Sequence, residues 1–504
     1  MLPAPLKHYK HTAKLAKSLS PKTIYNWLME IGYYPENYVL PPCFTVSKHP
    51  KYGKRYYNYK RNKFNPPITQ YREFQLPKNQ LSDRTFGIIA PEHYSDIAYA
   101  LSKNWKLITN CLFHRDNKVC SYSFPISITK NKTGELSKLR SGRMIYEYIE
   151  MAENDLTSIA YKYKYIISTD IKNFYPSIYT HSIPWALHGK KNIREKKNRY
   201  NYNLVGNRLD KLFQYCNDGC TNGIPIGPVV SDIISEIILS AADTQLSKYI
   251  NDEVIVVRFK DDYRFLAKSK DAGYKIIKHL QRSLREYKLE LNEGKTSDNE
   301  LPNGLFRPWV SQYHAANPNP KYYYSFKRFK EVLLSVVSID ENNPGTGVID
   351  RFLADIVTSK YRLRVQLTKK SQPKIISLLL MLGELRTKAF PKILAIIEEI
   401  LKTSDGSTPS LTIAPHIEEY LNRLRLNESD NVYLLTWLCY FIKANKLDKH
   451  FSKKYKFNDD IVQSTFTSRR SLFKNSTDFK IFTGVKTVSR NVSMLRHLDV
   501  FRPQ

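Results

Sequence analysis

The sequence predicts an α+β region followed by an all-α region, and three observations support this division. Between residues 85 and 345, apolar stretches with the two-residue period of strands alternate with stretches of helical spacing. From residue 346 onward, one helical pattern follows another. The length of 504 residues exceeds one ordinary domain of roughly 100–200 residues. We therefore divide the chain into residues 1–84, 85–345 and 346–504.

The last of these parts contains an internal similarity. Residues 373–382 read PKIISLLLML, and residues 391–400 read PKILAIIEEI. Related helical segments that follow one another are typical of helical-repeat proteins, so we expect a HEAT-like arrangement. An ordinary helical bundle is the alternative.

The charge balance indicates a polyanionic partner. Lys and Arg number 79 against 47 Asp and Glu, which gives a net charge of +32. Basic clusters bind phosphate backbones by displacing condensed counterions, and the 36 Tyr and 23 Phe offer rings on which bases can stack. A surface of solvated lysines is the alternative. Hydrophobic residues make up 42% of the chain, which is enough for a buried core and excludes a disordered protein.

One basic segment is also rich in tyrosine. Residues 48–63 contain seven Lys or Arg, no acid, and Tyr52, Tyr56, Tyr57 and Tyr59. Aromatic rings between basic residues suit a track for single-stranded nucleic acid. A solvated loop with a few packed tyrosines explains the same pattern.

The six cysteines do not form a zinc-binding pattern. Cys216 and Cys220 are close in sequence, but no second pair or nearby His completes a site. We expect free thiols in a reducing compartment. The first residues lack the apolar core of a signal peptide, and the longest apolar run, Ile375–Leu382, is too short to cross a bilayer. The sequence therefore predicts a cytoplasmic protein with no membrane partner.

Two β-rich stretches of the middle region lead to acidic residues. Residues 163–170 form a predicted strand that ends on Asp170. Residues 253–268 are predicted to form two strands joined by Lys-Asp-Asp, which is a hairpin with Asp261 and Asp262 at its tip. Helical spacing after Pro228 and over residues 271–287 predicts helices behind these strands. The order of elements indicates a sheet backed by helices.

Carboxylates that converge from separate strands suit one kind of chemistry. Transfer of a nucleotidyl group needs an activated hydroxyl and a stabilised pyrophosphate, and two Mg²⁺ ions about 4 Å apart serve both needs. Hard oxygen ligands hold such ions. Asp170, Asp261 and Asp262 are therefore our candidates for a catalytic two-metal site.

These segments resemble the motifs of reverse transcriptases. Residues 170–178 (DIKNFYPSI) look like motif A, and residues 223–232 (GIPIGPVVSD) look like motif B. Residues 258–265 (RFKDDYRF) are similar to motif C, and residues 289–296 (LELNEGKT) to motif D. The resemblance implies an RNA-directed DNA polymerase with an α+β right-hand fold. The first part of the chain would then be a basic arm and the start of the fingers, and the second part the fingers and palm.

The resemblance also implies roles for single residues. Asp170 and Asp261 would bridge two Mg²⁺ ions, with Asp262 assisting. The main-chain carbonyl of Ile171 would add an oxygen ligand. Lys295 would lie near the leaving pyrophosphate, as a general acid or an electrostatic clamp.

Further residues are candidates for binding the nucleotide. Tyr175 lies five positions after Asp170, where the family has an aromatic ring beneath the sugar that would clash with a 2′-hydroxyl. It therefore favours dNTPs and a DNA product, although simple packing under the sheet is the alternative. The basic stretch 130–143 matches the fingers in position, and its cations could grip a triphosphate. The other nucleotide-binding candidates are Lys138, Arg140, Arg143, Pro225 and Gly227.

The motif B segment departs from the family. Most reverse transcriptases carry Gln between its Pro and Gly, near the nascent base pair, and here that position is Ile226. Ile cannot form hydrogen bonds there, so the departure puts ordinary template reading in doubt. It leaves the catalytic residues intact.

In length and layout the chain looks most like the prophage-encoded abortive-infection members of the bacterial defence-associated reverse transcriptases. This resemblance implies antiphage defence, homo-oligomeric assembly, and template-independent DNA synthesis primed from a protein hydroxyl. The priming residue is open, with Tyr9 in the basic N-terminal arm as one guess. One alternative is an enzyme templated by a dedicated non-coding RNA, as in retron-like systems. Another is a nucleic-acid-binding scaffold without catalysis.

Overall fold

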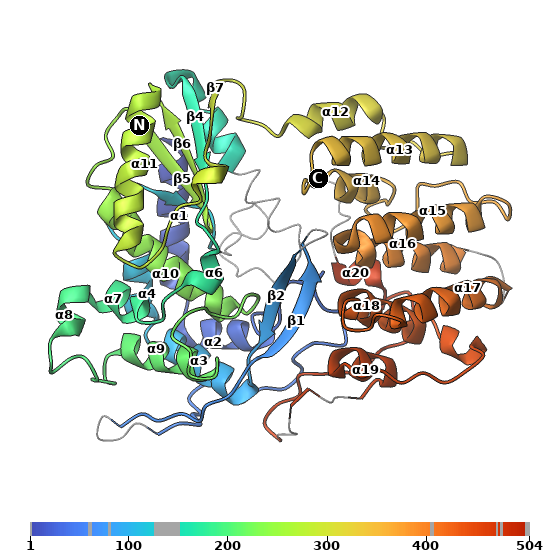
Figure 1. Cartoon of the computed structure of the whole chain (residues 1–504), viewed down its shortest axis with the longest axis horizontal. Coiled ribbons are helices and arrows are strands. Elements are labelled where there is room, and N and C mark those ends of the chain that lie inside the picture. The colour runs from blue at the N-terminus through green and yellow to red at the C-terminus, as the bar shows by residue number, and fades with distance from the viewer. Residues whose placement is uncertain are drawn as a thin grey trace.

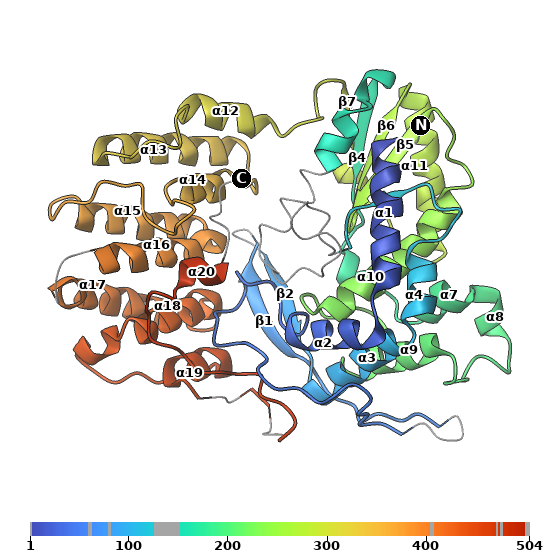
Figure 2. The same cartoon turned by 180° about the vertical axis from the view of Figure 1, so that it is seen from behind.

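The computed structural model has two parts that lie side by side, with a hairpin between them (Figure 1). One part combines a sheet with helices, and the other is a stack of helices; both views show the hairpin β1–β2 at their boundary (Figure 2). The structure describes residues 3–58, 63–78, 82–124, 152–403, 408–469, 472–473 and 477–498.

A five-stranded sheet forms the centre of the first part. Its strand order is β3-β5-β6-β4-β7, and all neighbouring strands are antiparallel except β3 and β5. The apolar, β-branched sequences of the central strands explain why they are buried on the sheet. The predicted hairpin over residues 253–268 is confirmed. The strands are β3 (Cys120–Ser121), β4 (Tyr165–Thr169), β5 (Val254–Phe259), β6 (Asp262–Ala267) and β7 (Ser297–Glu300).

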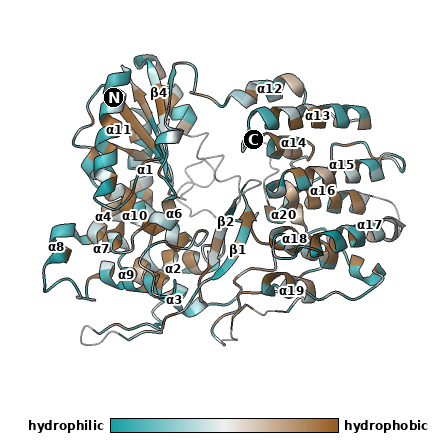
Figure 3. Ribbon diagram, viewed as in Figure 1, coloured by the Kyte–Doolittle hydropathy of each residue, from teal (hydrophilic) through white to brown (hydrophobic). Residues whose placement is uncertain are grey.

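Two long helices support this sheet. Helix α10 (Val229–Leu246) begins directly after Pro228 and is largely buried, as its nearly continuous apolar sequence requires. Helix α11 (Lys270–Arg285) begins at Ser269, whose hydroxyl accepts a hydrogen bond from the Ala272 amide at 3.2 Å. Both helices were predicted and are confirmed. In Figure 3 the sheet strands are mostly coloured hydrophobic, while hydrophilic colour dominates the surface of α11.

The N-terminal residues form two helices, whereas the sequence of residues 10–35 predicts one short helical segment. Helix α1 (Ala4–Ser18) ends before α2 (Pro21–Glu30), because Ser20 caps α2 and Pro21 opens it. The hydroxyl of Ser20 accepts from the Thr23 amide at 3.1 Å. Helix α2 packs against α3 (Pro91–Lys103).

Two strands and several short helices complete the first part. Strands β1 (Arg72–Pro77) and β2 (Asp83–Ile88) form a separate two-stranded sheet. The shorter helices are α4 (Trp105–Leu112), α6 (Phe174–Ser177), α7 (Ser182–His188), α8 (Lys190–Arg194) and α9 (Val205–Tyr215).

Helices dominate the described residues after β7. The similar segments at 373–382 and 391–400 lie in neighbouring helices that pack on each other, α15 and α16. The change to helices is therefore confirmed, whereas a HEAT-like repeat and the boundary at residue 346 stay predictions. The helices are α12 (Pro308–Ala316), α13 (Phe326–Asn342), α14 (Val348–Asp355), α15 (Gln372–Leu385), α16 (Phe390–Thr403), α17 (Thr408–Arg425), α18 (Val432–Ala444), α19 (Asp460–Thr467) and α20 (Met494–Leu498).

The two parts share buried contacts. The Tyr433 hydroxyl of α18 donates to the Tyr38 carbonyl at 2.9 Å, and the Trp437 indole donates to the Val39 carbonyl at 3.2 Å. Further along the chain, Lys480 pairs with Lys48 as an antiparallel bridge. The helical part thus holds the segment that leads from α2 to the hairpin.

The tyrosines of segment 48–63 take part in packing. Tyr52, Tyr56 and Tyr57 are half-buried against the core, and the Tyr56 hydroxyl donates to Asp478 Oδ2 at 2.9 Å. This placement favours the packed-loop interpretation for these three residues. Tyr59 lies outside the described residues.

The remaining expectations on cysteines and membranes can be compared with the structure. All six cysteines are free, and only Cys111 and Cys220 reach solvent. Among the residues that the structure covers, none of the helices has the length and apolar character needed to span a bilayer.

Candidate active site

The sheet brings the three predicted carboxylates to one edge. Asp170 directly follows β4, and Asp261 and Asp262 lie at the turn between β5 and β6. Strand β4 pairs with β6, and the last pair of that ladder is Thr169 with Tyr263. One step beyond it, Asp170 and Asp262 are neighbours across adjacent strands.

The hairpin tip has an unusual backbone conformation. Lys260 has a φ of 50°, in the left-handed region that few non-glycine residues adopt. Two hydrogen bonds hold this turn: the Lys260 amide donates to Ser123 Oγ at 2.7 Å, and Arg258 Nη1 donates to the Lys260 carbonyl at 3.0 Å. The surrounding structure therefore fixes the residue that precedes Asp261.

Lys295 is in direct contact with this acidic edge. It lies in the 3-10 helix η3 (Glu293–Lys295), and its Nζ donates to Asp170 Oδ2 at 2.6 Å. This hydrogen bond, with the negative charge of the carboxylates, raises the pKa of Lys295. The other oxygen, Asp170 Oδ1, is buried and has no hydrogen-bond partner.

Burial and the charges of neighbouring acids raise the pKa values of both aspartates at the tip, although nearby cations oppose the shift. Burial raises the pKa of the Asp261 carboxyl, and the charge of Asp170 adds to the effect. Asp262 reaches solvent. Desolvation by the surrounding protein, and then the negative charges of Asp261 and Asp170, raise its pKa to about 6. The cluster thus favours any added positive charge.

The donor set fits a divalent cation. Within the described residues, no three His, Cys, Asp or Glu side chains already stand at metal-binding positions. However, Asp170 Oδ1 lacks a partner, and the Lys295 ammonium is the positive charge that now contacts the cluster. All available donors are oxygens, which hard cations prefer.

Ile171 is placed to add a main-chain oxygen. It forms an isolated antiparallel bridge with Leu291, and the bridge bonds run from the Lys172 amide to Glu290 and from the Asn292 amide to Asp170. In such a pair the carbonyl of the central residue points away from its partner strand. The Ile171 carbonyl therefore faces the β6 side, where the aspartates lie.

Asp170, Asp262 and Lys295 line a recess of about 290 Å³. Its lining combines residues at the ends of β4, β5 and β6 with the lysine of η3. The members are Ala152, Ser168, Thr169, Asp170, Val257, Arg258, Phe259, Asp262, Tyr263, Arg264 and Lys295.

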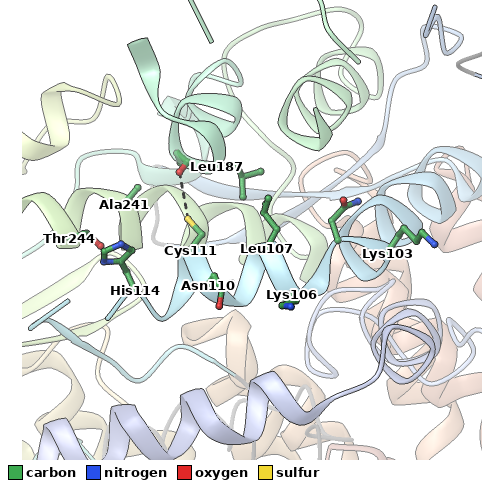
Figure 4. A pocket seen from close by; sticks show the side chains of 11 residues that line it. Lys103, Lys106, Leu107, Asn110, Cys111, His114, Leu187, Ala241 and Thr244 are labelled. Atoms are coloured by element: carbon green, nitrogen blue, oxygen red, sulfur yellow. Dashed lines mark hydrogen bonds between the residues drawn. The ribbon is translucent and has the colours of Figure 1, made fainter. Parts of the chain in front are cut away.

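A larger hollow of about 700 Å³ lies between α4, α7 and α10 (Figure 4). Cys111 points into it and donates to the Ala186 carbonyl at 3.6 Å. The described residues that line it include no carboxylate, so it offers no acidic oxygen ligand for a hard divalent cation.

A buried ionic network lies under the hairpin. Arg258 of β5 is 1% exposed and forms hydrogen bonds with Glu236 and Asp243 of α10, all between 2.8 and 2.9 Å. The Tyr263 hydroxyl donates to Asp243 at 2.7 Å. The sequence analysis did not identify these residues, although Glu236 and Asp243, seven positions apart among the apolar residues of α10, are a signal for a buried partner.

The predicted nucleotide-binding residues fall in different environments. Tyr175 is buried in α6, and its hydroxyl donates to Asp232 Oδ1 at 2.5 Å. Pro225 is buried against Gly87 of β2, while Gly227 has a φ of 114° and lies against Pro35. Lys138, Arg140 and Arg143 lie outside the described residues.

Arg84 is a cation that the sequence analysis missed. It is exposed on β2, and its charge acts on Asp261 in the direction that lowers the carboxyl pKa. The fingers-like hairpin thus brings a positive charge toward the recess. No spacing rule links a residue on β2 to an acid 177 positions later, so sequence alone gave no signal.

Tyr9 lies in a different environment from the one expected. It is 5% exposed in α1, where its hydroxyl donates to the Leu112 carbonyl at 3.0 Å and accepts from Asn117 at 3.1 Å. Burial raises the pKa of this phenol. Its enclosure argues against a role as a primer, which must reach the reacting nucleotide.

Comparisons with known proteins identify the central region. Residues 98–302 match the family model for reverse transcriptase (RNA-dependent DNA polymerase). No curated protein matches the chain. Among solved structures, apo telomerase from Candida tropicalis is 13% identical over 73% of this chain and 69% of that chain, with a TM-score of 0.35. Telomerase from Candida albicans in complex with a TWJ fragment of telomeric RNA is 12% identical over 69% and 64%, with a TM-score of 0.30.

Domains of the matched family act on nucleic acid and generally use divalent metal ions. Residues 98–302 include the strand ends that carry the acidic cluster and Lys295. Residues 98–302 are therefore similar to a reverse transcriptase domain, and this match indicates a nucleotidyltransferase of the RNA-directed DNA polymerase type.

Proposed function

We propose that this domain extends DNA by two-metal catalysis, with Asp170, Asp261 and Asp262 as the catalytic carboxylates. The observation that carries the proposal is the β4–β6 register, which makes Asp170 and Asp262 neighbours across adjacent strands. The unpartnered Asp170 Oδ1 and the raised pKa of Asp262 support a site that gains from bound cations. We infer Mg²⁺ as the ion, because every donor is a hard oxygen.

The proposed mechanism assigns a task to each residue. Asp170, Asp261, Asp262 and the Ile171 carbonyl would hold the ions. Bound there, the ions would supply activation of the attacking hydroxyl and stabilisation of the charge that develops on the pyrophosphate. Lys295 exchanges its contact with Asp170 Oδ2 for one with the leaving group, where its ammonium donates a proton or neutralises charge.

Tyr175 is the proposed determinant of sugar selectivity. Its ring is packed between α6 and α10, close to the end of β4. In this role it excludes a 2′-hydroxyl, so dNTPs are the substrates and DNA is the product. Replacement of Tyr175 by Ala is expected to admit ribonucleotides.

We further propose that synthesis is template-independent and protein-primed, in antiphage defence. The support is the motif B loop, where Ile226 offers no side-chain hydrogen bond and its carbonyl accepts from the Gly87 amide at 2.9 Å. The loop is thus attached to the hairpin β1–β2 at the position where the family places a Gln. Assembly into homo-oligomers belongs to the same proposal, and light scattering of the purified protein tests it.

One incorporation experiment tests these proposals. Purified protein is incubated with Mg²⁺ and labelled dNTPs without template or primer, and the products are separated on a denaturing gel. Label that migrates with the protein supports protein priming, and mass spectrometry of labelled peptides then identifies the priming residue. Label that appears only when RNA copurifies supports the RNA-templated alternative.

Variants complete the experiment. Asp170→Ala and Asp261→Ala are each expected to lower incorporation by roughly 10³-fold, since each removes several kcal/mol of transition-state stabilisation. The matched control is Asp271→Ala, an exposed acid in the first turn of α11. Incorporation that persists in both site variants refutes the site. Absence of label with the wild-type protein in every condition leaves the non-catalytic scaffold.

A further inference from the structure

Asp232 connects three segments around the recess. It lies in the first turn of α10, and its Oδ1 accepts the hydrogen bond from the buried Tyr175 hydroxyl at 2.5 Å. Lys260 Nζ lies 3.5 Å from the same oxygen. One carboxylate oxygen therefore joins the helix after β4, the start of α10 and the turn that carries Asp261.

The position of the Tyr175 ring depends on few main-chain constraints. Helix α6 is only four residues long, and it begins at Asn173, whose φ of 44° lies in the left-handed region. The ring packs at an angle of 63° against Phe174, and its hydroxyl end is held by the hydrogen bond to Asp232 and by a further side-chain contact with Ser235. A phenol that donates to a carboxylate forms a short, charge-assisted bond with a defined direction.

Lys260 holds the carboxylate from the other side. Its Nζ also lies 4.0 Å from Glu36 Oε1, and Glu36 accepts from the Tyr38 hydroxyl at 2.8 Å. The ammonium thus lies between two carboxylates. The ammonium attracts the Asp232 carboxylate from the side of the turn and so helps to hold it next to the Tyr175 hydroxyl.

We propose that Asp232 is the positioning residue for Tyr175 and thereby sets the preference of the site for deoxyribose over ribose. The proposal rests on the proposed function, in which Tyr175 is the ring beneath the sugar. Asp232 does not touch the nucleotide in this role. It fixes the hydroxyl end of the ring, so that the ring edge occupies the space that a 2′-hydroxyl would need.

A purely structural role predicts a different result. An acid in the first turn of a helix stabilises that helix through its dipole, whatever happens to Tyr175. Such a role changes the thermal midpoint but leaves the choice between sugars unaltered. The ratio of kcat/KM for a dNTP to that for the matching rNTP therefore separates the two roles.

The experiment measures this ratio for wild type, Tyr175→Ala, Tyr175→Phe, Asp232→Ala and Asp232→Asn. We expect Asp232→Ala and Tyr175→Phe to lower the ratio by a similar factor of roughly tenfold, chiefly through a lower KM for the rNTP. The double variant Tyr175→Phe/Asp232→Ala should be no worse than either single one, because both remove the same bond. Asp232→Asn keeps an acceptor oxygen and should recover part of the ratio. Asp271→Ala, the exposed acid at the start of α11, should match wild type.

The outcomes distinguish this proposal from the proposed function. An unchanged ratio in Asp232→Ala, with a collapsed ratio in Tyr175→Ala, overturns the role of Asp232 alone. An unchanged ratio in Tyr175→Ala overturns both the role of Asp232 and the sugar selectivity of Tyr175. Failure of the wild type to incorporate either nucleotide overturns both proposals. If Asp232→Ala does not fold, Tyr175→Phe removes the same hydrogen bond, and an unchanged ratio there is equally decisive.

Discussion

Asp262 shows how a side chain that we propose for catalysis can destabilise the fold. Its carboxyl lies beside Asp261 and Asp170, and burial with these like charges raises its pKa to about 6 from 3.8. A group whose pKa rises on folding destabilises the folded state once it is ionised. The penalty is absent below about pH 4, grows as the pH rises to about 6, and is then fully present.

Asp262→Asn should therefore stabilise the protein in the absence of divalent ions. Its thermal midpoint is expected to exceed that of wild type at pH 7.5, and the difference should vanish well below pH 3.8, where the Asp262 carboxyl is protonated in both the folded and the unfolded protein. Added Mg²⁺ should raise the wild-type midpoint more than that of the variant. Scanning fluorimetry across this pH range is the measurement. Equal midpoints at pH 7.5 without metal would contradict the raised pKa.

At the residue scale, the sequence identified the acids but not the groups that position them. Asp170, Asp261 and Asp262 could be proposed from the sequence because each follows or precedes a recognisable strand. Arg258 and Asp232 act through contacts between elements, which no local pattern encodes. The burial of Tyr9 was unpredictable for the same reason: a tyrosine in a basic segment gives no sign that its hydroxyl will bond to the Leu112 carbonyl.

The hairpin β5–β6 depends on one buried cation for its attachment to α10. Arg258 is 1% exposed, and its partner Asp243 is fully buried, so removal of Arg258 leaves Asp243 and Glu236 without their compensating charge. Arg258 also donates to the Lys260 carbonyl and so stabilises the left-handed turn. Stability and active-site geometry therefore depend on the same side chain.

Arg258→Met is expected to cost about 3–5 kcal/mol, the usual effect of breaking a buried ion pair. The midpoint of urea unfolding should fall accordingly, and incorporation should fall with it, because the tip loses its support. Arg285→Met, on the exposed face of α11, is the matched control. A loss below about 1 kcal/mol would show that the network is dispensable.

The contact between β2 and the motif B loop gives a second prediction at this scale. A Cβ at Gly87 would lie 2.5 Å from Pro225 Cβ, and the proline ring cannot turn aside. Gly87→Ala should cost about 1–3 kcal/mol by overpacking and should lower incorporation by moving the loop. Urea unfolding and the incorporation assay check both effects, with Asp83→Asn on the same strand as control. Unchanged activity would show that this loop position is unimportant.

Elements were predictable where they carry a strong apolar period. The hairpin over 253–268 and the helices α10 and α11 followed from spacing alone. Strand β7 (Ser297–Glu300) did not, because its sequence Ser-Asp-Asn-Glu is polar and only its pairing with β4 makes it a strand. The sequence predicted one helical segment where the structure has α1 and α2, because the capping Ser20 and Pro21 start a new helix.

On the scale of the whole molecule, α18 joins the helical part to the reverse transcriptase domain. Trp437 is fully buried, and its indole donates to the Val39 carbonyl in the segment between α2 and the hairpin. Phe74 of β1 packs against Tyr433 of the same helix, with ring centroids 6.1 Å apart. The two parts therefore share one core, and damage to one should spread to the other.

Trp437→Ala should loosen both sides of this contact. The cavity is expected to cost about 3–5 kcal/mol. Hydrogen–deuterium exchange should rise in α18 and also in residues 33–48, which belong to the other part. Leu334→Ala, 60% exposed on α13, is the control. A rise confined to α18 would show that the parts are independent.

Contacts over such distances in sequence were beyond prediction. Nothing in residues 33–48 or in residues 477–482 indicates that they pair, because each is short and lacks a period of its own. The net charge of +32 indicated a polyanionic partner but not which surface binds it. Only the folded chain shows that the helical part supports the motif B loop through the hairpin β1–β2.

The pairing of Lys48 with Lys480 has a consequence for how the enzyme comes into being. A ribosome makes the acidic cluster long before it makes the residues that brace the segment ahead of the hairpin. During that interval the nascent chain contains its proposed catalytic carboxylates but lacks the residues around Lys480 that pair with Lys48. Premature termination would release a chain without this support, and we expect such a chain to be inactive. DNA synthesis would then be restricted to translation products that include the residues around Lys480.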